Sequence, residues 1–139
     1  MSRNPLADDV WRSIIALVFD NRDTWRRAVV EESGLPFSRV RILRRLSGRS
    51  MTVKELARAA TVDAPAATVA INDLEARGLV IRETDQTNRR CKVVSLTADG
   101  RAVVRKIDAV DDPAPEVFAE LGDDALKSLQ SVLAKLSPK

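Results

Sequence analysis

The sequence predicts a mainly α-helical fold with a small β-hairpin (α+β), as three consecutive patterns indicate. Two short apolar patterns with helical spacing are separated by Thr61-Val62-Asp63. Two runs rich in β-branched residues, 79–84 and 91–96, follow on either side of the polar segment 85–90. Two helices joined by a tight turn and followed by a hairpin form a winged helix-turn-helix, with the hairpin as its wing.

Capping residues mark the two short helices. Thr52 can accept a hydrogen bond from the backbone at the start of the first helix, and Glu55 can return one, which makes a capping box. Asp63 can cap the second helix, which has Pro65 in its first turn and Gly78 at its end. The residues predicted to face the core are Val53, Leu56, Ala57 and Ala60 in the first helix and Ala67, Ala70, Ile71 and Leu74 in the second.

Two helices are predicted before this pair. A long amphipathic helix runs from about residue 5 to residue 32, and we expect Trp11 and Trp25 in it to pack in the core rather than contact a ligand or partner. The next helix opens at Leu35-Pro36 and ends at Gly48, with apolar residues inward and arginines outward. These arginines face either solvent or DNA; they are Arg39, Arg41, Arg44 and Arg45.

Two further helices are predicted after the hairpin. Thr97 caps the first, which ends before the segment Asp-Pro-Ala-Pro at 112–115, and the last helix runs from about residue 123 to residue 136. Apolar stripes at both ends of the chain exceed what a small winged module can cover. We therefore predict one domain over residues 1–139, with a DNA-binding part at 36–100 and dimerisation helices at 5–32 and 101–137.

The amino-acid composition narrows the range of possible functions. The 139 residues include no histidine and no tyrosine, so the commonest general base and metal ligand is missing, and we expect neither an enzyme nor a cofactor or metal. No apolar run approaches the ~20 residues that a bilayer requires, and nothing resembles a signal peptide. The expected location is the cytoplasm. Residues 38–58 carry seven basic side chains and one acidic one, a balance that suits a polyanionic partner.

Eight residues are candidates for contact with double-stranded DNA. On the outward face of the second short helix, Asn72 could read adenine and Thr68 could bond a base or phosphate, while apolar neighbours could touch thymine methyl groups. Basic residues at the wing suit insertion into a narrow minor groove. The candidates are Ala64, Pro65, Thr68, Val69 and Asn72 on the helix and Arg89, Arg90 and Lys92 at the wing.

The chain resembles the MarR family of bacterial winged-helix transcriptional regulators over nearly its whole length, most specifically from residue 52 to residue 101. The resemblance is carried by TVKELARAA, NDLEARGLV, DQTNRR and VVSLTADGR, in this order and spacing. It implies a homodimer with interleaved terminal helices that binds a pseudo-palindromic operator, with Arg90 in the minor groove. It also implies a repressor that is released by a small-molecule effector, anionic or phenolic.

The sequence departs from the family pattern at three places. Asn88 stands where the family usually has an aspartate that orients the wing, and Ala64, Ala66 and Val69 stand where polar residues are common. The single cysteine, Cys91, lies at the second wing strand, and we interpret it as an inert thiol rather than a redox switch. The alternative function is a winged-helix module that binds protein and not DNA, because such folds are reused for assembly.

Overall fold

The computed structural model describes residues 3–137, which form two compact units. Residues 22–110 make one unit, and residues 3–21 together with 111–137 belong to the other. The elements along the chain are α1 (Pro5–Asp20), α2 (Asp23–Ser33), α3 (Phe37–Leu46), β1 (Met51–Thr52), α4 (Val53–Ala60), α5 (Ala64–Ala76), β2 (Val80–Thr84), β3 (Lys92–Leu96), α6 (Ala98–Asp108), the 3-10 helix η1 (Glu116–Glu120) and α7 (Asp123–Leu136).

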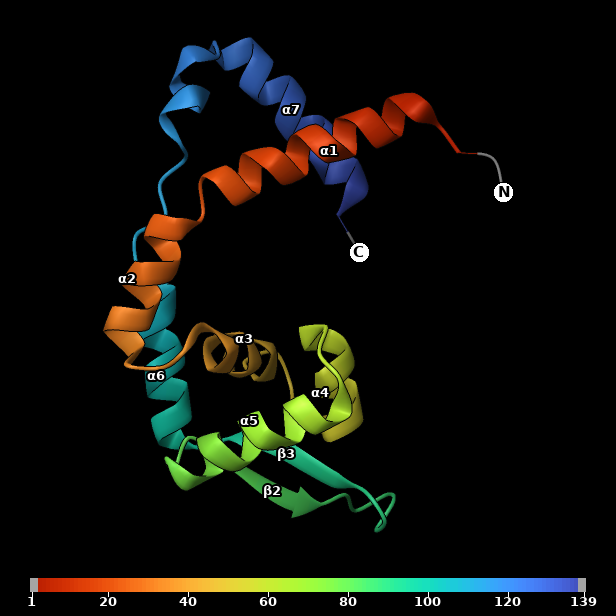
Figure 1. Ribbon diagram of the computed structural model, residues 1–139, viewed down its shortest axis with the longest axis vertical. Helices are drawn as coiled ribbons and strands as arrows, with labels where there is room; N and C mark the ends of the chain where they lie inside the picture. The colour runs from red at the N-terminus through yellow and green to blue at the C-terminus, as the bar shows by residue number, and fades with distance from the viewer. Residues whose placement is uncertain (1–2, 138–139) are drawn as a thin grey trace. The chain divides into compact units, whose positions relative to one another are not determined.

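The core of the unit 22–110 is built around α3. This helix contacts α2, α4, α5 and α6, and α4 and α5 pack against each other below it (Figure 1). The predicted inward sets of α4 and α5 are confirmed, apart from the half-buried Val53. The fully buried large side chains are Val29, Val40, Leu43, Leu56, Ile71, Leu74, Val80, Val94 and Ile107.

The predicted caps of the helix-turn-helix are all present. Thr52 Oγ1 accepts from the amide of Glu55 at 3.1 Å, and Glu55 Oε1 accepts from the amide of Thr52 at 3.1 Å. Asp63 Oδ1 accepts from the amide of Ala66 at 2.7 Å, so this carboxylate begins α5. Between the helices Thr61 has φ of 58°, a left-handed conformation that a β-branched residue rarely adopts.

The wing belongs to a sheet of three strands and not only to a hairpin. Strands β2 and β3 pair antiparallel as predicted, with Val80 opposite Leu96 and Thr84 opposite Lys92. The short β1 adds to the other edge of β3, giving the order β1-β3-β2. We did not predict β1, because two residues immediately before a helix are too few to show a period of two.

The first turn of α6 is joined tightly to the end of the helix-turn-helix. Thr97 Oγ1 caps α6 through the amide of Gly100 at 3.0 Å and also donates to the carbonyl of Gly78 at 2.7 Å. The amide of Thr97 donates to the carbonyl of Leu79 at 3.0 Å. Gly100 itself packs so closely that a Cβ atom there would overlap the carbonyl oxygen of Leu79.

The long helix predicted from residue 5 to residue 32 is wrong, because the chain breaks it into α1 and α2. The break lies at Asn21, whose side-chain amide donates to the carbonyl of Leu17 at 2.8 Å. Asparagine competes for backbone hydrogen bonds in this way, which makes it unfavourable inside a helix. The same position is the boundary between the two compact units.

The two tryptophans have different environments. Trp25 packs against the core of unit 22–110, edge to face with Phe37 at 5.7 Å between ring centroids, as we predicted. Trp11 on α1 remains 62% exposed, so the expectation of core packing is wrong for this residue in a single chain. The apolar stripe of α1 finds few partners, and for that reason it buries no residue.

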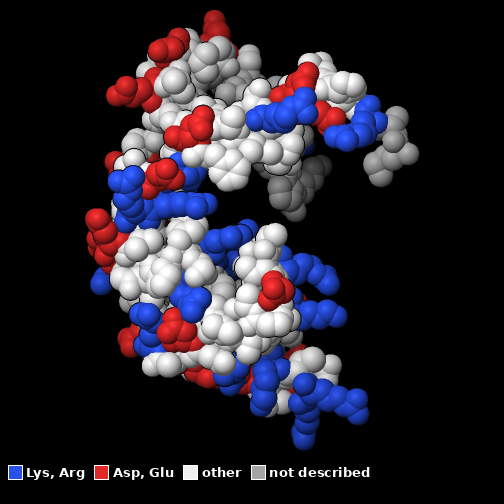
Figure 2. All heavy atoms as spheres, in the orientation of Figure 1, with Lys and Arg blue, Asp and Glu red and all other residues white. Residues whose placement is uncertain are grey.

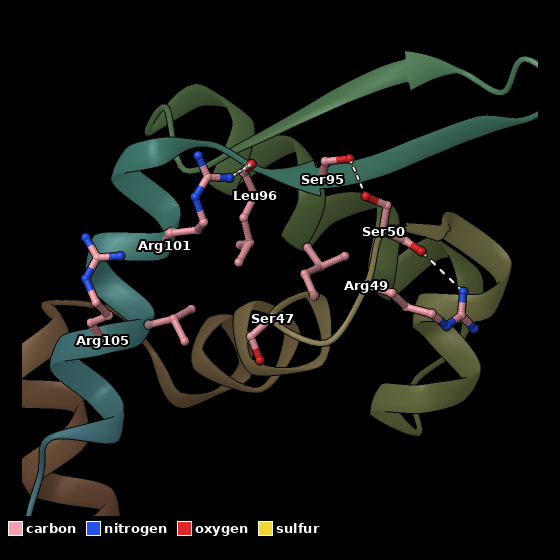
Figure 3. Close-up of a pocket in the computed structure, with 9 residues that line it drawn as sticks. Ser47, Arg49, Ser50, Ser95, Leu96, Arg101 and Arg105 are labelled. Carbon is pink, nitrogen blue, oxygen red and sulfur yellow. Dashed lines mark hydrogen bonds between the residues drawn. The ribbon is translucent and has the colours of Figure 1, made fainter.

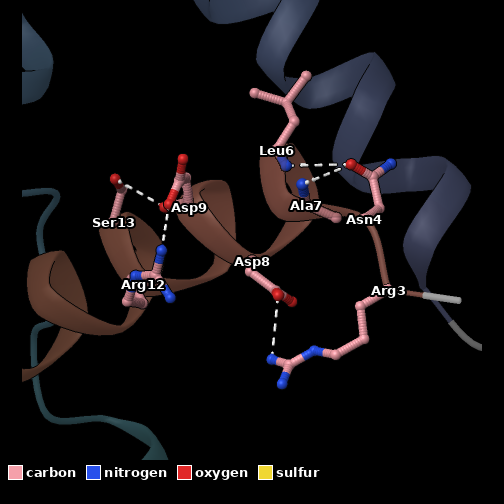
Figure 4. Close-up of polar contacts among 8 residues, drawn as sticks. All are labelled: Arg3, Asn4, Leu6, Ala7, Asp8, Asp9, Arg12 and Ser13. Carbon is pink, nitrogen blue, oxygen red and sulfur yellow. Dashed lines mark hydrogen bonds and ion pairs between the residues drawn. The ribbon is translucent and has the colours of Figure 1, made fainter.

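The N-terminal end of α1 is held by local polar contacts (Figure 4). Asn4 Oδ1 accepts from the amides of Leu6 and Ala7 at 3.0 and 3.2 Å, which caps the helix. Arg3 forms an ion pair with Asp8 at 3.0 Å, and Arg12 forms one with Asp9. Each contact links residues at most five positions apart. The start of α1 is therefore determined by the local sequence and not by tertiary packing.

Replacing Gly100 by Ala should destabilise the unit 22–110 strongly, because the new methyl group would displace the Leu79 carbonyl. We expect the free energy of unfolding to fall by about 3 kcal/mol, measured by urea denaturation. The matched control is Gly48→Ala, where the nearest atom to a Cβ is the Arg45 carbonyl oxygen at 3.9 Å. That control should change stability by no more than about 0.5 kcal/mol, and an equal loss in both variants would contradict the close approach.

Candidate nucleic-acid interface

The outward face of α5 carries all five predicted helix candidates. Ala64, Pro65, Val69 and Asn72 are exposed, and Val69 keeps 61% of its surface in contact with solvent. Thr68 is half-buried, and its hydroxyl donates to the carbonyl of Ala64 at 3.0 Å. This bond uses the hydroxyl proton, so Thr68 offers only acceptor capacity outward and Asn72 is the one amide on the face.

Asp73 fixes α5 to α3. Its carboxylate accepts from Arg39 of α3 at 3.0 Å and from Arg77, the residue that follows α5, at 3.1 Å. The hydrogen bond from Arg39, followed by that from Arg77, lowers the pKa of Asp73 below its ordinary value. The carboxylate is therefore ionised at neutral pH and sits between two cations.

The four arginines of α3 are thus only partly available to solvent or DNA. Arg39 pairs with Asp73, and Arg41 Nη2 donates to the carbonyl of Ala60 at 2.7 Å, where it caps the C-terminal end of α4. The sequence predicts that these arginines face either solvent or DNA. Arg39 is half-buried by its ion pair, whereas Arg41 stays exposed to solvent although it also contacts α4. Their acceptors lie 34 and 19 residues along the chain, beyond the reach of helical periodicity.

A second ion pair joins α5 to the sheet. Arg82 on β2 contacts the Glu75 carboxylate at 2.8 Å, and this hydrogen bond lowers the pKa of Glu75. Both partners are partly covered, with 30% and 39% of their side chains exposed. Helix α5 is therefore tied on one side to α3 and on the other side to the strand that leads into the wing.

The wing presents the three predicted basic residues on its surface. Arg89 and Arg90 lie exposed at the tip, and Lys92 follows on β3, where its Nζ donates to Thr84 Oγ1 at 3.0 Å. Figure 2 shows Lys and Arg side chains gathered at the hairpin end of the unit, the lower end of the view. The wing brings positive charge to the same end of the unit as the exposed face of α5.

Asp85 and Asn88 organise the wing tip by hydrogen bonds. Asp85 Oδ1 accepts from the amide and the hydroxyl of Thr87 at 2.9 and 2.8 Å, and these bonds lower the pKa of Asp85. Asn88 Oδ1 accepts from the amide of Arg90 at 3.2 Å. The side-chain oxygen of Asn88 therefore accepts a wing amide at the position where the family usually has an aspartate. The neighbouring Cys91 is half-buried.

Two other kinds of site are absent from residues 3–137. Within these residues no three His, Cys, Asp or Glu side chains are grouped so that they could hold a metal ion. In the same range no helix is long and apolar enough to cross a bilayer.

Comparison with known proteins relates the geometry to a family. The model of the MarR family matches residues 33–90, which run from the end of α2 to the wing tip. Wild-type apo MarR from E. coli superposes with a TM-score of 0.76 at 21% identity, covering 99% of this chain and 100% of that one. Sco3205, a MarR family transcriptional regulator from Streptomyces coelicolor solved in complex with DNA, gives 0.65 at 26% identity, covering 98% and 88%.

NadR, solved in complex with 4-hydroxyphenylacetate, gives a TM-score of 0.66 at 24% identity and covers 98% of this chain and 94% of that one. These matches confirm the predicted winged helix-turn-helix and the resemblance to the MarR family, a family of transcriptional regulators and not of enzymes.

Asp73→Asn should remove a contribution to stability that depends on pH. Because the folded-state pKa of Asp73 lies below its ordinary value of 3.8, ionisation favours folding. The contribution is complete above the ordinary pKa and is lost as the pH falls through the lowered one. Urea denaturation should show a constant gap between wild type and variant from about pH 7 to about pH 5, narrowing towards pH 3. A gap that does not change with pH would contradict the role of the charge.

Proposed function

We propose that this chain, which matches the MarR family over residues 33–90 and has the fold of its regulators, is a dimeric, sequence-specific DNA-binding transcriptional regulator. The observation that carries the proposal is the exposed face of α5 beside a wing that ends in Arg89 and Arg90, both anchored within one compact unit. The complex of Sco3205 with DNA supports the same use of this fold.

The two parts of the interface have different tasks in this proposal. Ala64, Pro65 and Val69 offer only apolar contacts, so α5 senses thymine methyl groups and groove shape, with Asn72 as its base-reading amide. Arg89 and Arg90, with Lys92 behind them, supply most of the electrostatic attraction to the phosphates and the minor groove. Selectivity then depends on shape and on the spacing of the half-sites as much as on direct readout.

The exposed apolar side chains of the unit formed by residues 3–21 and 111–137 support a homodimer. Large apolar residues on a monomer's surface mark an interaction site when many occur together. We propose that the helices within 5–32 and 101–137 form the dimer interface and that the two α5 helices bind half-sites of a pseudo-palindromic operator. The exposed apolar residues are Leu6, Val10, Trp11, Leu17, Val18, Phe19, Val117, Leu121, Leu129, Val132, Leu133 and Leu136.

We further propose that the protein is a cytoplasmic repressor relieved by a small molecule, anionic or phenolic. NadR was solved with 4-hydroxyphenylacetate, a molecule that is both. Release requires only that the ligand prefer a dimer geometry in which the two α5 helices no longer match the half-sites.

The second candidate function is a module that binds protein and not DNA. The apolar character of the α5 face, above all the exposed Val69, favours it. The dependence of binding on salt separates the two functions, because phosphate contacts release counterions and an apolar interface does not.

Arg90→Ala should weaken binding to every duplex by a similar factor. The plot of log affinity against log salt concentration should become shallower by about 1 per subunit, because one cationic contact is lost. Fluorescence anisotropy with the DNA upstream of the gene, at several salt concentrations, measures both effects. An unchanged slope would mean that the wing stays off the DNA, and no binding at low salt would exclude the regulator altogether.

Two further variants are compared with Arg90→Ala in the same binding measurement. Arg27→Ala removes an exposed arginine of α2 that is not among the proposed DNA contacts. Once sedimentation velocity shows that this variant remains a dimer, its slope should be unchanged. Asn72→Ala should instead relax the preference for one base per half-site by about 1–3 kcal/mol, if Asn72 reads adenine. A uniform loss over all sequences would assign Asn72 to the DNA backbone.

Leu133→Lys should dissociate the dimer, because it places a charge in the proposed apolar interface. In the single chain, 46% of the surface of Leu133 is exposed. Sedimentation velocity should show a shift from dimer to monomer, with the helical content retained. The matched control is Ser128→Lys on the same helix, where the new charge replaces an exposed polar residue. If both variants remain dimers, α7 lies outside the interface.

A further inference from the structure

The unit 22–110 contains a cavity of about 390 Å³ between α3, β3 and α6, on residues outside the DNA contacts proposed above (Figure 3). Its volume lies in the range of small-molecule sites, which is roughly 300–1,000 Å³. Three arginines, three serines and three apolar residues line it, and no acidic residue is among them. The lining consists of Leu46, Ser47, Arg49, Ser50, Ser95, Leu96, Arg101, Val104 and Arg105.

Two of the arginines lie one helical turn apart on α6. Arg101 Nη1 donates to the carbonyl of Leu96 at 3.1 Å, whereas the exposed guanidinium of Arg105 has no hydrogen bond or ion pair among residues 3–137. Like charges four residues apart on a helix repel each other. An anion between them would relieve this repulsion and would supply Arg105 with an acceptor.

The remaining lining suits a ligand with an apolar body. Leu46 and Val104 are buried and Leu96 is half-buried, so they form an apolar surface in the cavity. The hydroxyls of Ser50 and Ser95 lie 2.6 Å apart and bond to each other across β1 and β3. A compact inorganic ion would leave the apolar part of the cavity uncovered, whereas a carboxylate on an aromatic or aliphatic body would fill both parts.

The third arginine connects the cavity to the helix-turn-helix. Arg49 Nη2 contacts the Glu55 carboxylate at 2.8 Å, and this bond is the main reason that the pKa of Glu55 is lowered. The other oxygen of the same carboxylate accepts from the amide of Thr52 at the start of α4. An anion that attracts Arg49 would therefore compete with the carboxylate that caps α4.

We propose that this cavity binds a small organic anion, a carboxylate on an apolar body, through Arg101 and Arg105, and that Arg49 transmits its binding to the N-terminal end of α4. Binding of the anion in this cavity does not depend on whether the protein is a transcriptional regulator. Its use as the effector site rests on that function.

The first experiment measures binding to the full chain by isothermal titration calorimetry, with benzoate as the probe and benzamide as its neutral counterpart. Benzoate should bind and benzamide should bind at least about tenfold more weakly, the effect expected from a hydrogen bond to a charged group. Arg105→Ala should weaken benzoate binding by a similar factor. Arg45→Ala, which removes an exposed arginine of α3 outside the lining, should leave it unchanged.

Equal binding of benzoate and benzamide, unchanged benzoate binding in Arg105→Ala, or no benzoate binding would overturn the proposed site. Circular dichroism of each variant shows whether it is folded, and the Arg45→Ala control shows whether loss of any arginine is sufficient.

The second experiment reads the connection to α4 from the amide NMR signal of Thr52. Benzoate should shift this signal in the wild type. Glu55→Gln keeps the capping box, which accepts Gln in place of Glu, but removes the charge that pairs with Arg49. Benzoate should still bind this variant and leave the Thr52 signal unmoved; an unmoved signal in the wild type, or the same shift in the variant, would overturn the connection.

DNA affinity measured without benzoate tests the proposed function separately. A chain that binds benzoate but no DNA would refute the regulator and retain the site.

Discussion

Two carboxylates on the C-terminal half of α5 link this helix to α3 and to the sheet. Asp73 binds Arg39 of α3, and Glu75 binds Arg82 of β2. The inner face of the helix buries Ile71 and Leu74 completely, and the small side chains of Ala67 and Ala70 allow close packing. The apolar contacts hold the helix against the core, and the partly covered ion pairs add direct links from it to α3 and to the strand that leads into the wing.

In the proposed DNA interface, affinity and selectivity come from different parts of the protein. The α5 face is almost uncharged, whereas the wing tip carries Arg89 and Arg90 on a loop held by Asp85 and Asn88. A basic tip beside a neutral helix favours a mechanism in which charge attracts the DNA and groove shape selects the binding site. Asn88 retains the hydrogen bond that such a tip needs, although it lacks the negative charge of an aspartate.

Features set by neighbouring residues could be predicted from the sequence. The capping box of Thr52 and Glu55 and the cap at Asp63 depend on contacts within one turn, and the bounds of α7 follow its apolar pattern. The break at Asn21 could not be predicted, because it interrupts a continuous apolar pattern without Gly or Pro. The contacts of Arg39 and Arg41 and the cavity beside α6 bring together segments that are distant in the sequence. They could therefore be identified only in the folded structure.

Apolar side chains such as Trp11 and Leu136 remain largely uncovered in a single copy, with 62% and 72% of their surfaces exposed. In the proposed dimer their burial couples DNA binding to the number of protein copies in the cell. Below the dissociation constant of the dimer, the amount of paired protein rises with the square of the chain concentration. Synthesis and degradation of the chain would then control operator occupancy steeply, as a second input beside any ligand.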